Sequence, residues 1–294
     1  MVELVTIGTN NCLMKQNNLL INLQGVSFNY PGGPPVLKQL DFKLSRGNRI
    51  GLIAPNGSGK TTLLHLIMGL LKPSAGRIEI FGKLTRDEKD FADVRRKIGL
   101  LFQDADDQLF SPTVLEDVAF GPLNLGKPKN EARQIAQKTL DFLGLNGFED
   151  RITFKLSGGE KRLVSLATVL AMAPEVLLLD EPVNGLDIKT KAKLKEVLSN
   201  LDLSFILISH DFDFLAETAD AIYTMQGGKI LLDTELQVHE HVHAHEHGVY
   251  PHQHEMTDDR EQASGDRRKR TEDRRQRTED RRQKTEVRQK RTED

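Results

Sequence analysis

The chain has 294 residues, of which 38% are hydrophobic, and this length allows one or two domains. Its 41 Lys and Arg residues nearly balance its 43 Asp and Glu residues, which argues against nucleic acid as the main partner. The single cysteine, Cys12, excludes an internal disulfide, and apolar runs such as residues 176–179 are far shorter than the ~20 residues that cross a bilayer. We therefore expect a protein of the reducing cytosol, without an export leader, that reaches a membrane only through a partner.

Short apolar runs alternate with helical patterns along the chain, and this alternation predicts an α/β fold with a largely parallel sheet. Residues 19–44 contain alternating patterns, including Leu40, Phe42 and Leu44, which predict an antiparallel flank. A helix over residues 60–71 would place Leu70 and Leu71 on its sheet-facing side, and residues 133–143 predict a separate helical insertion. Strands are predicted over residues 49–54, 97–102, 176–180 and 204–209.

The two ends of the chain differ in composition from its centre. We predict an N-terminal extension over residues 1–18, a folded domain over 19–236, a histidine-rich linker over 237–256 and a charged low-complexity tail over 257–294. The tail holds 14 Lys or Arg and 11 Asp or Glu among 38 residues, in a seven-residue repeat that begins as RTEDRRQ at Arg270. The repeat has no apolar seam, so we expect a disordered segment or a solvated single helix.

Residues 49–62 read as a strand, a glycine-rich loop and a helix. Glycines let backbone N–H groups approach phosphate oxygens, Lys60 can reach the β and γ phosphates, and Thr61 can ligate Mg²⁺. Ala54 stands where such loops usually begin with glycine, and a plain strand-to-helix connection is the alternative. The predicted phosphate-binding residues are Asn56, Gly57, Ser58, Gly59, Lys60, Thr61 and Thr62.

Two adjacent carboxylates follow the apolar run at residues 176–179. Asp180 would hold Mg²⁺, directly or through water, and Glu181 would polarise the water that attacks the γ-phosphate. The alternative is an ordinary turn through Pro182, and the pairing with the upstream loop favours catalysis.

A third motif, LSGGE, occupies residues 156–160. Ser157 and Glu160 have the spacing of a helix capping box. Gly158 and Gly159 would each cost a helix about 1 kcal/mol relative to alanine, so capping alone does not explain them. A close approach to phosphate does.

The ordered motifs resemble an ABC ATPase: the loop at 56–62, LSGGE at 156–160, LLLDEP at 177–182, GLD at 185–187 and His210 after an apolar strand. The resemblance covers residues 19–234 and implies a P-loop NTPase core with an antiparallel β subdomain and a helical subdomain. It implies that Gln103 senses Mg²⁺ and the membrane partner, that His210 contacts the γ-phosphate, and that Tyr30 stacks on adenine. It also implies a dimer, homomeric or heteromeric, with Asp187 at the interface and Ser157, Gly158 and Gly159 completing the phosphate site of the opposite subunit.

The segments LFQDADDQLF at 101–110 and TVLEDVAFGPLNLG at 113–126 resemble the energy-coupling factor branch of ABC importers. In that branch the segment after the glutamine faces the coupling helices of an integral membrane subunit, and Ala105 here replaces a commonly found proline. The resemblance implies a peripheral protein at the cytoplasmic face of the cell membrane. Residues 157–182 are similar to the cobalt and nickel members, although vitamin importers share much of this pattern.

Seven of the nine histidines gather in one segment. In an extended chain the alternate residues project to one side, and imidazoles there suit Ni²⁺, Co²⁺, Zn²⁺ or Cu²⁺. A solvated, pH-responsive linker is the alternative. Combined with the resemblance, the histidines predict nickel or cobalt import; a vitamin cargo, a soluble ABC ATPase and a metal-buffering protein remain as alternatives. The candidate ligands for Ni²⁺ or Co²⁺ are His239, His241, His243, His245, His247, His252 and His254.

Overall fold

The computed structural model describes residues 18–231. Within this range, no helix is long and apolar enough to span a membrane. Most of the N-terminal extension, the histidine-rich linker with its seven candidate metal ligands, and the repeat tail lie outside the described residues.

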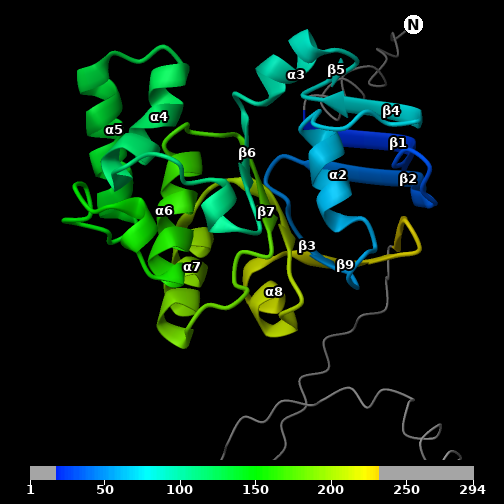
Figure 1. The fold of residues 1–294 in the computed structure, drawn as a ribbon. Coiled ribbons are helices and arrows are strands. Elements are labelled where there is room, and N and C mark those ends of the chain that lie inside the picture. Colours follow the sequence, from blue (N-terminus) through cyan, green and yellow to red (C-terminus); the bar gives the residue numbers. More distant parts are fainter. Residues whose placement is uncertain (1–17, 232–294) are drawn as a thin grey trace, which may run out of the picture. The chain divides into compact units, whose positions relative to one another are not determined.

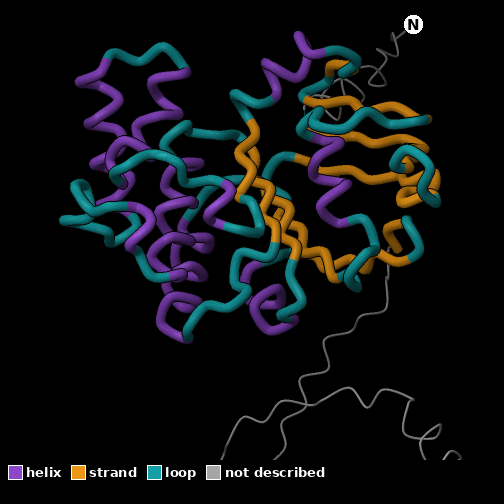
Figure 2. Tube along the Cα trace, viewed as in Figure 1, coloured by secondary structure: helices purple, strands orange, loops and turns teal. Residues whose placement is uncertain are grey.

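A six-stranded sheet forms the centre of the described part of the chain (Figure 2). Its neighbouring strands pair in parallel from β9 to β6, and β10 pairs with β9 antiparallel. The four predicted central strands are confirmed to within one residue at either end. In spatial order the strands are β10 (Lys229–Leu231), β9 (Ala221–Gln226), β3 (Arg49–Ile53), β8 (Ser204–Ile208), β7 (Val176–Asp180) and β6 (Ile98–Leu101).

The central strands are apolar at nearly every position because both faces of the sheet are covered. In β7, Val176 and Leu178 belong to one apolar cluster, whereas Leu177 and Leu179 belong to a second one on the other face. The same alternation divides the residues of β8 between the two clusters. A strand buried on both sides has no polar face, which is why its pattern is a continuous apolar run.

An antiparallel sheet confirms the predicted flank and shares the first apolar cluster with α2 (Lys60–Ile67). Figure 1 shows this sheet, in blue to cyan, on the opposite side of the central strands from the green helices. Its strands, in spatial order, are β2 (Pro35–Ser45), β1 (Leu19–Asn29), β4 (Ala75–Ile80) and β5 (Lys83–Leu84).

The green helices confirm the helical subdomain and are more extensive than the predicted insertion at residues 133–143. The helices α4 (Val114–Asn124), α5 (Lys129–Phe142) and α6 (Gly158–Leu170) contact one another and share the second apolar cluster (Figure 1). The remaining elements are α3 (Glu88–Val94), η1 (Ala105–Asp107), η2 (Thr153–Lys155), α7 (Ile188–Asn200) and α8 (Phe212–Thr218).

The helix predicted over residues 60–71 is wrong at its C-terminal end, because α2 stops at Ile67. Gly69 has a φ of 67°, and the bonds from Leu70 N to His65 O and from Gly69 N to Leu66 O form a left-handed glycine cap. Leu70 lies beyond this cap and is 50% exposed. The apolar spacing that predicted the helix continues to Leu71, but the left-handed conformation of Gly69 ends the helix before it.

Candidate active site

Three segments at the carboxyl ends of parallel strands meet at one edge of the central sheet. Strands β3, β7 and β8 are parallel and in register, so their carboxyl ends lie side by side. The loop before α2 follows β3, Asp180 ends β7 and Glu181 follows it, and Ser209 and His210 follow β8. The parallel topology therefore brings together motifs that are far apart in the sequence.

The loop that enters α2 depends on glycine. Gly57 and Gly59 have φ angles of 77° and 99°, values that side chains with a Cβ rarely adopt. A Cβ on Gly59 would lie 2.9 Å from side-chain atoms of both Val36 and Leu37. No side chain of the described residues caps the N-terminus of α2, so its backbone N–H groups can bind an anion.

Ala54 fits the loop despite the missing glycine. It is buried, and its φ is not among the positive values that would favour glycine. The contribution of Ala54 to the loop comes from its main chain, because Lys60 Nζ donates a hydrogen bond to the Ala54 carbonyl at 2.9 Å. The alanine therefore leaves the loop able to hold the lysine.

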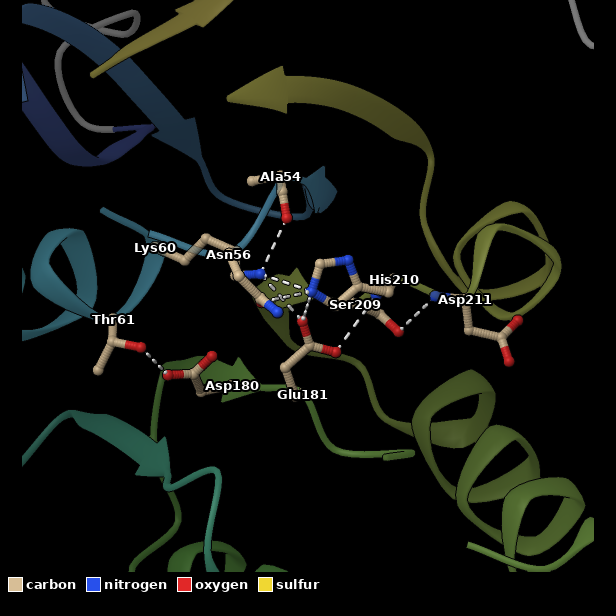
Figure 3. A network of polar contacts seen from close by, with 9 residues as sticks. All are labelled: Ala54, Asn56, Lys60, Thr61, Asp180, Glu181, Ser209, His210 and Asp211. Carbon is tan, nitrogen blue, oxygen red and sulfur yellow. Dashed lines mark hydrogen bonds and ion pairs between the residues drawn. The ribbon is translucent and has the colours of Figure 1, made fainter. Parts of the chain in front are cut away.

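Lys60, Glu181 and His210 form a cluster at the centre of the site (Figure 3). The Nζ atom of Lys60 lies 3.3 Å from Glu181 Oε1 and 2.7 Å from His210 Nε2, and these last two atoms are 3.1 Å apart. Lys60 and Glu181 are both buried, and Asn56 Oδ1 lies 3.3 Å from His210 Nε2. The sequence-predicted lysine, glutamate and histidine therefore share one small volume.

Glu181 is held in an uncommon backbone conformation. Its φ is 48°, in the left-handed region, where a residue other than glycine typically costs about 1–3 kcal/mol. Its backbone N–H donates to Ile208 O at 2.9 Å, and its Oε2 accepts from His210 N at 3.2 Å. The first bond fixes the main chain of Glu181, and the second restricts the rotation of its carboxylate.

Thr61 and Asp180 offer the oxygen ligands that Mg²⁺ prefers. Thr61 Oγ1 donates to Asp180 Oδ2 at 2.7 Å, whereas Asp180 Oδ1 is buried without a hydrogen-bond partner among the described residues. Burial raises the pKa of Asp180, while the Thr61 bond acts in the opposite direction. An unpaired buried carboxylate oxygen beside a hydroxyl fits a divalent cation, and Gln103 lines a cleft together with Thr61 and Asp180.

The predicted adenine-stacking residue, Tyr30, lines the cleft around Lys60, which has a volume of about 410 Å³. Tyr30 is 46% exposed, and its ring meets Phe28 edge to face with centroids 4.9 Å apart. Its hydroxyl lies 3.2 Å from Thr62 Oγ1. One face of the ring can therefore stack on a base while the edge is fixed. The cleft is lined by Tyr30, Val36, Asn56, Gly57, Gly59, Lys60, Thr61, Thr62, Gln103, Glu181, Asn184 and His210.

The LSGGE turn begins α6 but does not line the cleft around Lys60. Ser157 and Glu160 form the predicted capping box, and the bonds from Ser157 lower the pKa of Glu160. A Cβ on Gly158 would meet nothing within 4 Å, whereas one on Gly159 would lie 2.9 Å from Thr190 Oγ1. The two glycines therefore differ: Gly159 is required for packing against α7, and Gly158 leaves an open surface.

Asp187 also lies outside that cleft, at the N-terminus of α7. Its side chain accepts hydrogen bonds from Lys189 N, Thr190 N and Thr190 Oγ1, and the Thr190 bonds lower its pKa. Thr190 thus contacts Asp187 and packs on Gly159, which places the GLD and LSGGE motifs beside each other.

The sequence motifs did not predict three residues of the site: Asn184, Gln108 and Arg162. Asn184 lines the cleft around Lys60 and a neighbouring one of about 850 Å³, which extends to Gly158. Gln108 and Arg162 hold the backbone at Gln103. The sequence signal for Arg162 was its position directly before the apolar residues that begin at Leu163. An arginine at such a position either becomes buried or turns its charged group toward solvent.

Comparison with known proteins agrees with this geometry. A family model described as ABC transporter matches residues 37–184. A putative ABC transporter ATP-binding protein of Nitratidesulfovibrio vulgaris is 51% identical over 237 residues, which cover 78% of this chain and 87% of the relative. The energy-coupling factor transporter ATP-binding protein EcfA of Methanothermobacter thermautotrophicus is 41% identical over 224 residues, covering 74% and 72% of the two chains.

Two solved structures share the fold and part of the sequence. The cbiO1 protein of Clostridium perfringens, described as part of the ABC transporter complex cbiONQ, is 34% identical with a TM-score of 0.67, covering 73% of this chain and 88% of its own. The ATP-binding cassette MJ0796, in a dimeric post-hydrolysis state bound to ADP and Pi, is 28% identical with a TM-score of 0.66, covering 72% and 96%. The loop, the carboxylate pair and these matches together show that the chain belongs to the ABC transporter family and is one of its ATP-binding ATPases.

Proposed function

We propose that this chain is the ATP-hydrolysing subunit of an energy-coupling-factor-type importer that carries nickel or cobalt ions. The observation that carries the ATPase role is the cluster of Lys60, Glu181 and His210 beside the Thr61–Asp180 pair. The loop N–H groups and Lys60 bind the phosphates of ATP, and Tyr30 stacks on its adenine ring. Magnesium, held by Thr61, Asp180 and Gln103, would neutralise charge on the phosphates.

Hydrolysis needs a base beside the attacking water, and Glu181 fits that role best. Its carboxylate is buried, accepts a hydrogen bond from the His210 main-chain N–H, and lies within ion-pair distance of Lys60 and His210. A carboxylate placed in this way can accept the proton of the water while Lys60 and His210 face the γ-phosphate.

The proposed dimer rests on a phosphate-binding turn that lies outside the ATP cleft of its own chain. Ser157, Gly158 and Gly159 lie outside the cleft around Lys60, and the open face of Gly158 is suited to a phosphate from another chain. Asp187 lies beside this turn. Support comes from MJ0796, which is similar in structure and is described as dimeric.

A membrane subunit has a candidate docking surface on the helical subdomain, which we call the aromatic surface: Phe110, Phe120, Ile152 and Phe154. Phe110 and Phe154 are 65% and 71% exposed, and the rings of Phe110 and Phe120 meet edge to face with centroids 4.7 Å apart. The segments are adjacent, because Thr153 bonds to the carbonyls of Ser111 and Pro112. Large exposed apolar side chains gathered in this way are typical of a protein interface.

The cargo assignment depends on the histidine segment and on similarity. The seven histidines at 239–254 offer imidazole ligands, and similar proteins include EcfA and the cbiO1 subunit of cbiONQ. Among residues 18–231, no group of three or more His, Cys, Asp or Glu residues is arranged to hold a metal ion.

Nickel and cobalt uptake by cells that express the chain with its transporter subunits tests the proposal. Glu181→Gln should keep ATP binding and lower ATP hydrolysis about 10²- to 10⁴-fold, and uptake should be lost with it. The matched control is Glu175→Gln, the same chemical change at a more exposed carboxylate that pairs with Arg46 and Lys97. Undiminished hydrolysis by Glu181→Gln would reject the assigned base, and active ATPase without uptake of either metal would reject the cargo.

Two further variants separate docking from metal binding. Phe154→Ser should weaken co-purification with the membrane subunit, whereas Phe142→Ser should not, because Phe142 lies in a different groove with Leu170 and Leu201. Deletion of residues 239–254 should weaken nickel binding and spare ATP hydrolysis. Equal nickel binding by the deleted and full-length chains would contradict the role of the histidines.

A further inference from the structure

The backbone around Gln103 is held by side chains instead of by a sheet. Strand β6 ends at Leu101, and the next two residues leave the ladder. Arg162 Nη1 donates to Phe102 O at 2.6 Å, and Arg162 Nη2 donates to Gln103 O. Gln108 Oε1 accepts from Phe102 N at 3.2 Å. Two carbonyls and one N–H group at the glutamine are therefore bound by two side chains.

Both anchors connect the glutamine segment to α6. Arg162 belongs to that helix, and Gln108 Nε2 donates to Ser165 O and Thr168 Oγ1, each at 2.8 Å. Lys161, also on α6, pairs with Asp106 at 2.5 Å. The contacts come from successive turns on one side of the helix, so the glutamine segment and α6 are joined at several points.

Arg162 is buried at an energetic cost that helix formation does not explain. Its exposed fraction is 6%, and burial lowers its pKa, with Asp104 and Asp180 acting in the opposite direction. Among residues 18–231 it makes no ion pair within 4.0 Å, and its hydrogen bonds go to main-chain carbonyls. An apolar residue would fill this position without desolvating a charge, so the two carbonyls are the reason for the arginine.

The same helix begins with the LSGGE turn. Ser157 caps α6, and Arg162 lies in its second turn. Gly158 and Arg162 line the neighbouring cleft, of which Gln103 also forms a wall. A short helix is stiff, so a shift of the turn at its start moves the guanidinium, and through it the backbone of Gln103.

We infer that Arg162, supported by Gln108, is a positioning residue that ties Gln103 to the signature turn, so that these two parts move as one unit. The inference rests on the proposed dimer, in which Gln103 serves the site of its own chain and Ser157 serves the site of its partner. Arg162 then links the two ATP sites, because α6 carries Ser157 at its start and holds the Gln103 segment through Arg162.

The test compares Arg162→Met, Arg162→Lys and Gln108→Leu with the wild-type dimer. The matched control is Arg151→Met, which removes a half-exposed arginine that pairs with Glu160 of α6. ATP hydrolysis is measured against Mg²⁺ and ATP concentration, and amide hydrogen exchange is measured over residues 102–108. The exchange measurement reports on anchoring whether or not the chain hydrolyses ATP.

Arg162→Met should lower kcat up to about 100-fold, because a displaced catalytic group loses its alignment. The Mg²⁺ concentration for half-maximal activity should rise about 10-fold, as expected for the loss of a group that orients a metal ligand. Exchange over residues 102–108 should accelerate at least tenfold. Arg162→Lys, which can still reach one carbonyl, should recover part of each effect.

Two results would overturn the inference. One is wild-type Mg²⁺ dependence and exchange rates in both Arg162→Met and Gln108→Leu. The other is an equal loss of activity in Arg151→Met, which would indicate a general effect on α6. If Arg162→Met does not fold, the lysine variant and Gln108→Leu decide the matter by the same measurements. An inactive wild-type dimer would instead reject the proposed function, and the exchange rates would still decide whether Arg162 holds the segment.

Discussion

The buried pair of Lys60 and Glu181 makes a quantitative prediction about stability. Lys60→Met removes the ammonium from the cluster and leaves Glu181, which is 5% exposed, facing only His210. Loss of one partner of a buried ion pair typically costs about 3–5 kcal/mol, since the other charge stays desolvated. We expect Glu181→Gln to relieve much of that cost in the double variant.

The size of the coupling follows from the geometry. At 3.3 Å and an effective dielectric constant near 20, the attraction between the two charges is about 5 kcal/mol. Desolvation of both ions offsets part of it, and His210 remains close to Glu181. The contact is ionic and lacks an aligned hydrogen bond at Oε1. A coupling of about 2 kcal/mol is therefore expected, within the usual range for residues in contact.

Urea unfolding followed by circular dichroism, with nucleotide and Mg²⁺ removed, measures the four corners of this double-mutant cycle. The control cycle uses Lys193→Met and Glu196→Gln, a more exposed i, i+3 pair for which about 0.2–0.5 kcal/mol is expected. Additive effects of the Lys60 and Glu181 changes, no larger in coupling than the control, would refute the buried pair.

Three other changes test separate features of the structure. Gly69→Ala should lower the unfolding free energy by about 2–4 kcal/mol, because Gly69 has a positive φ and a Cβ would lie 2.1 Å from Phe91 Cγ; a thermal shift below that of a surface Gly→Ala change would contradict this. Burial raises the pKa of Asp117, so the folded chain keeps a proton that the unfolded chain releases, and stability falls as pH rises from 3.8 through the raised pKa. Asp117→Asn does not titrate, and its stability relative to the wild type should increase over that interval in urea titrations; a constant difference would argue against the shift. Asp180→Asn should keep the bond from Thr61 but raise the Mg²⁺ requirement of ATP hydrolysis about 10- to 100-fold, and an unchanged requirement would remove Asp180 from the metal site.

The central strands and the site at their ends could be predicted because their signals are local or topological. The apolar runs at 176–179 and 205–208 mark strands that are covered on both faces, and parallel strands place the residues after them at one edge of the sheet. The Ser157 capping box has the predicted partners, and the glycine-rich loop leads into α2 with a positive φ at Gly57 and Gly59. The end of α2 was wrong because a leucine pattern extends past Gly69, and the backbone conformation of a glycine outweighs apolar spacing.

Sequence by itself determined the strand ends, the order of the motifs and the chemical groups at the site, since each depends on a few neighbouring residues and on the rule that parallel strands align. Only the tertiary structure decided which groups meet: Arg162 with the carbonyls of Phe102 and Gln103, and Gly159 with Thr190. The physical reason is that a hydrogen bond or a close contact joins residues 31 to 60 positions apart, and neither periodicity nor composition encodes the partner across such a distance.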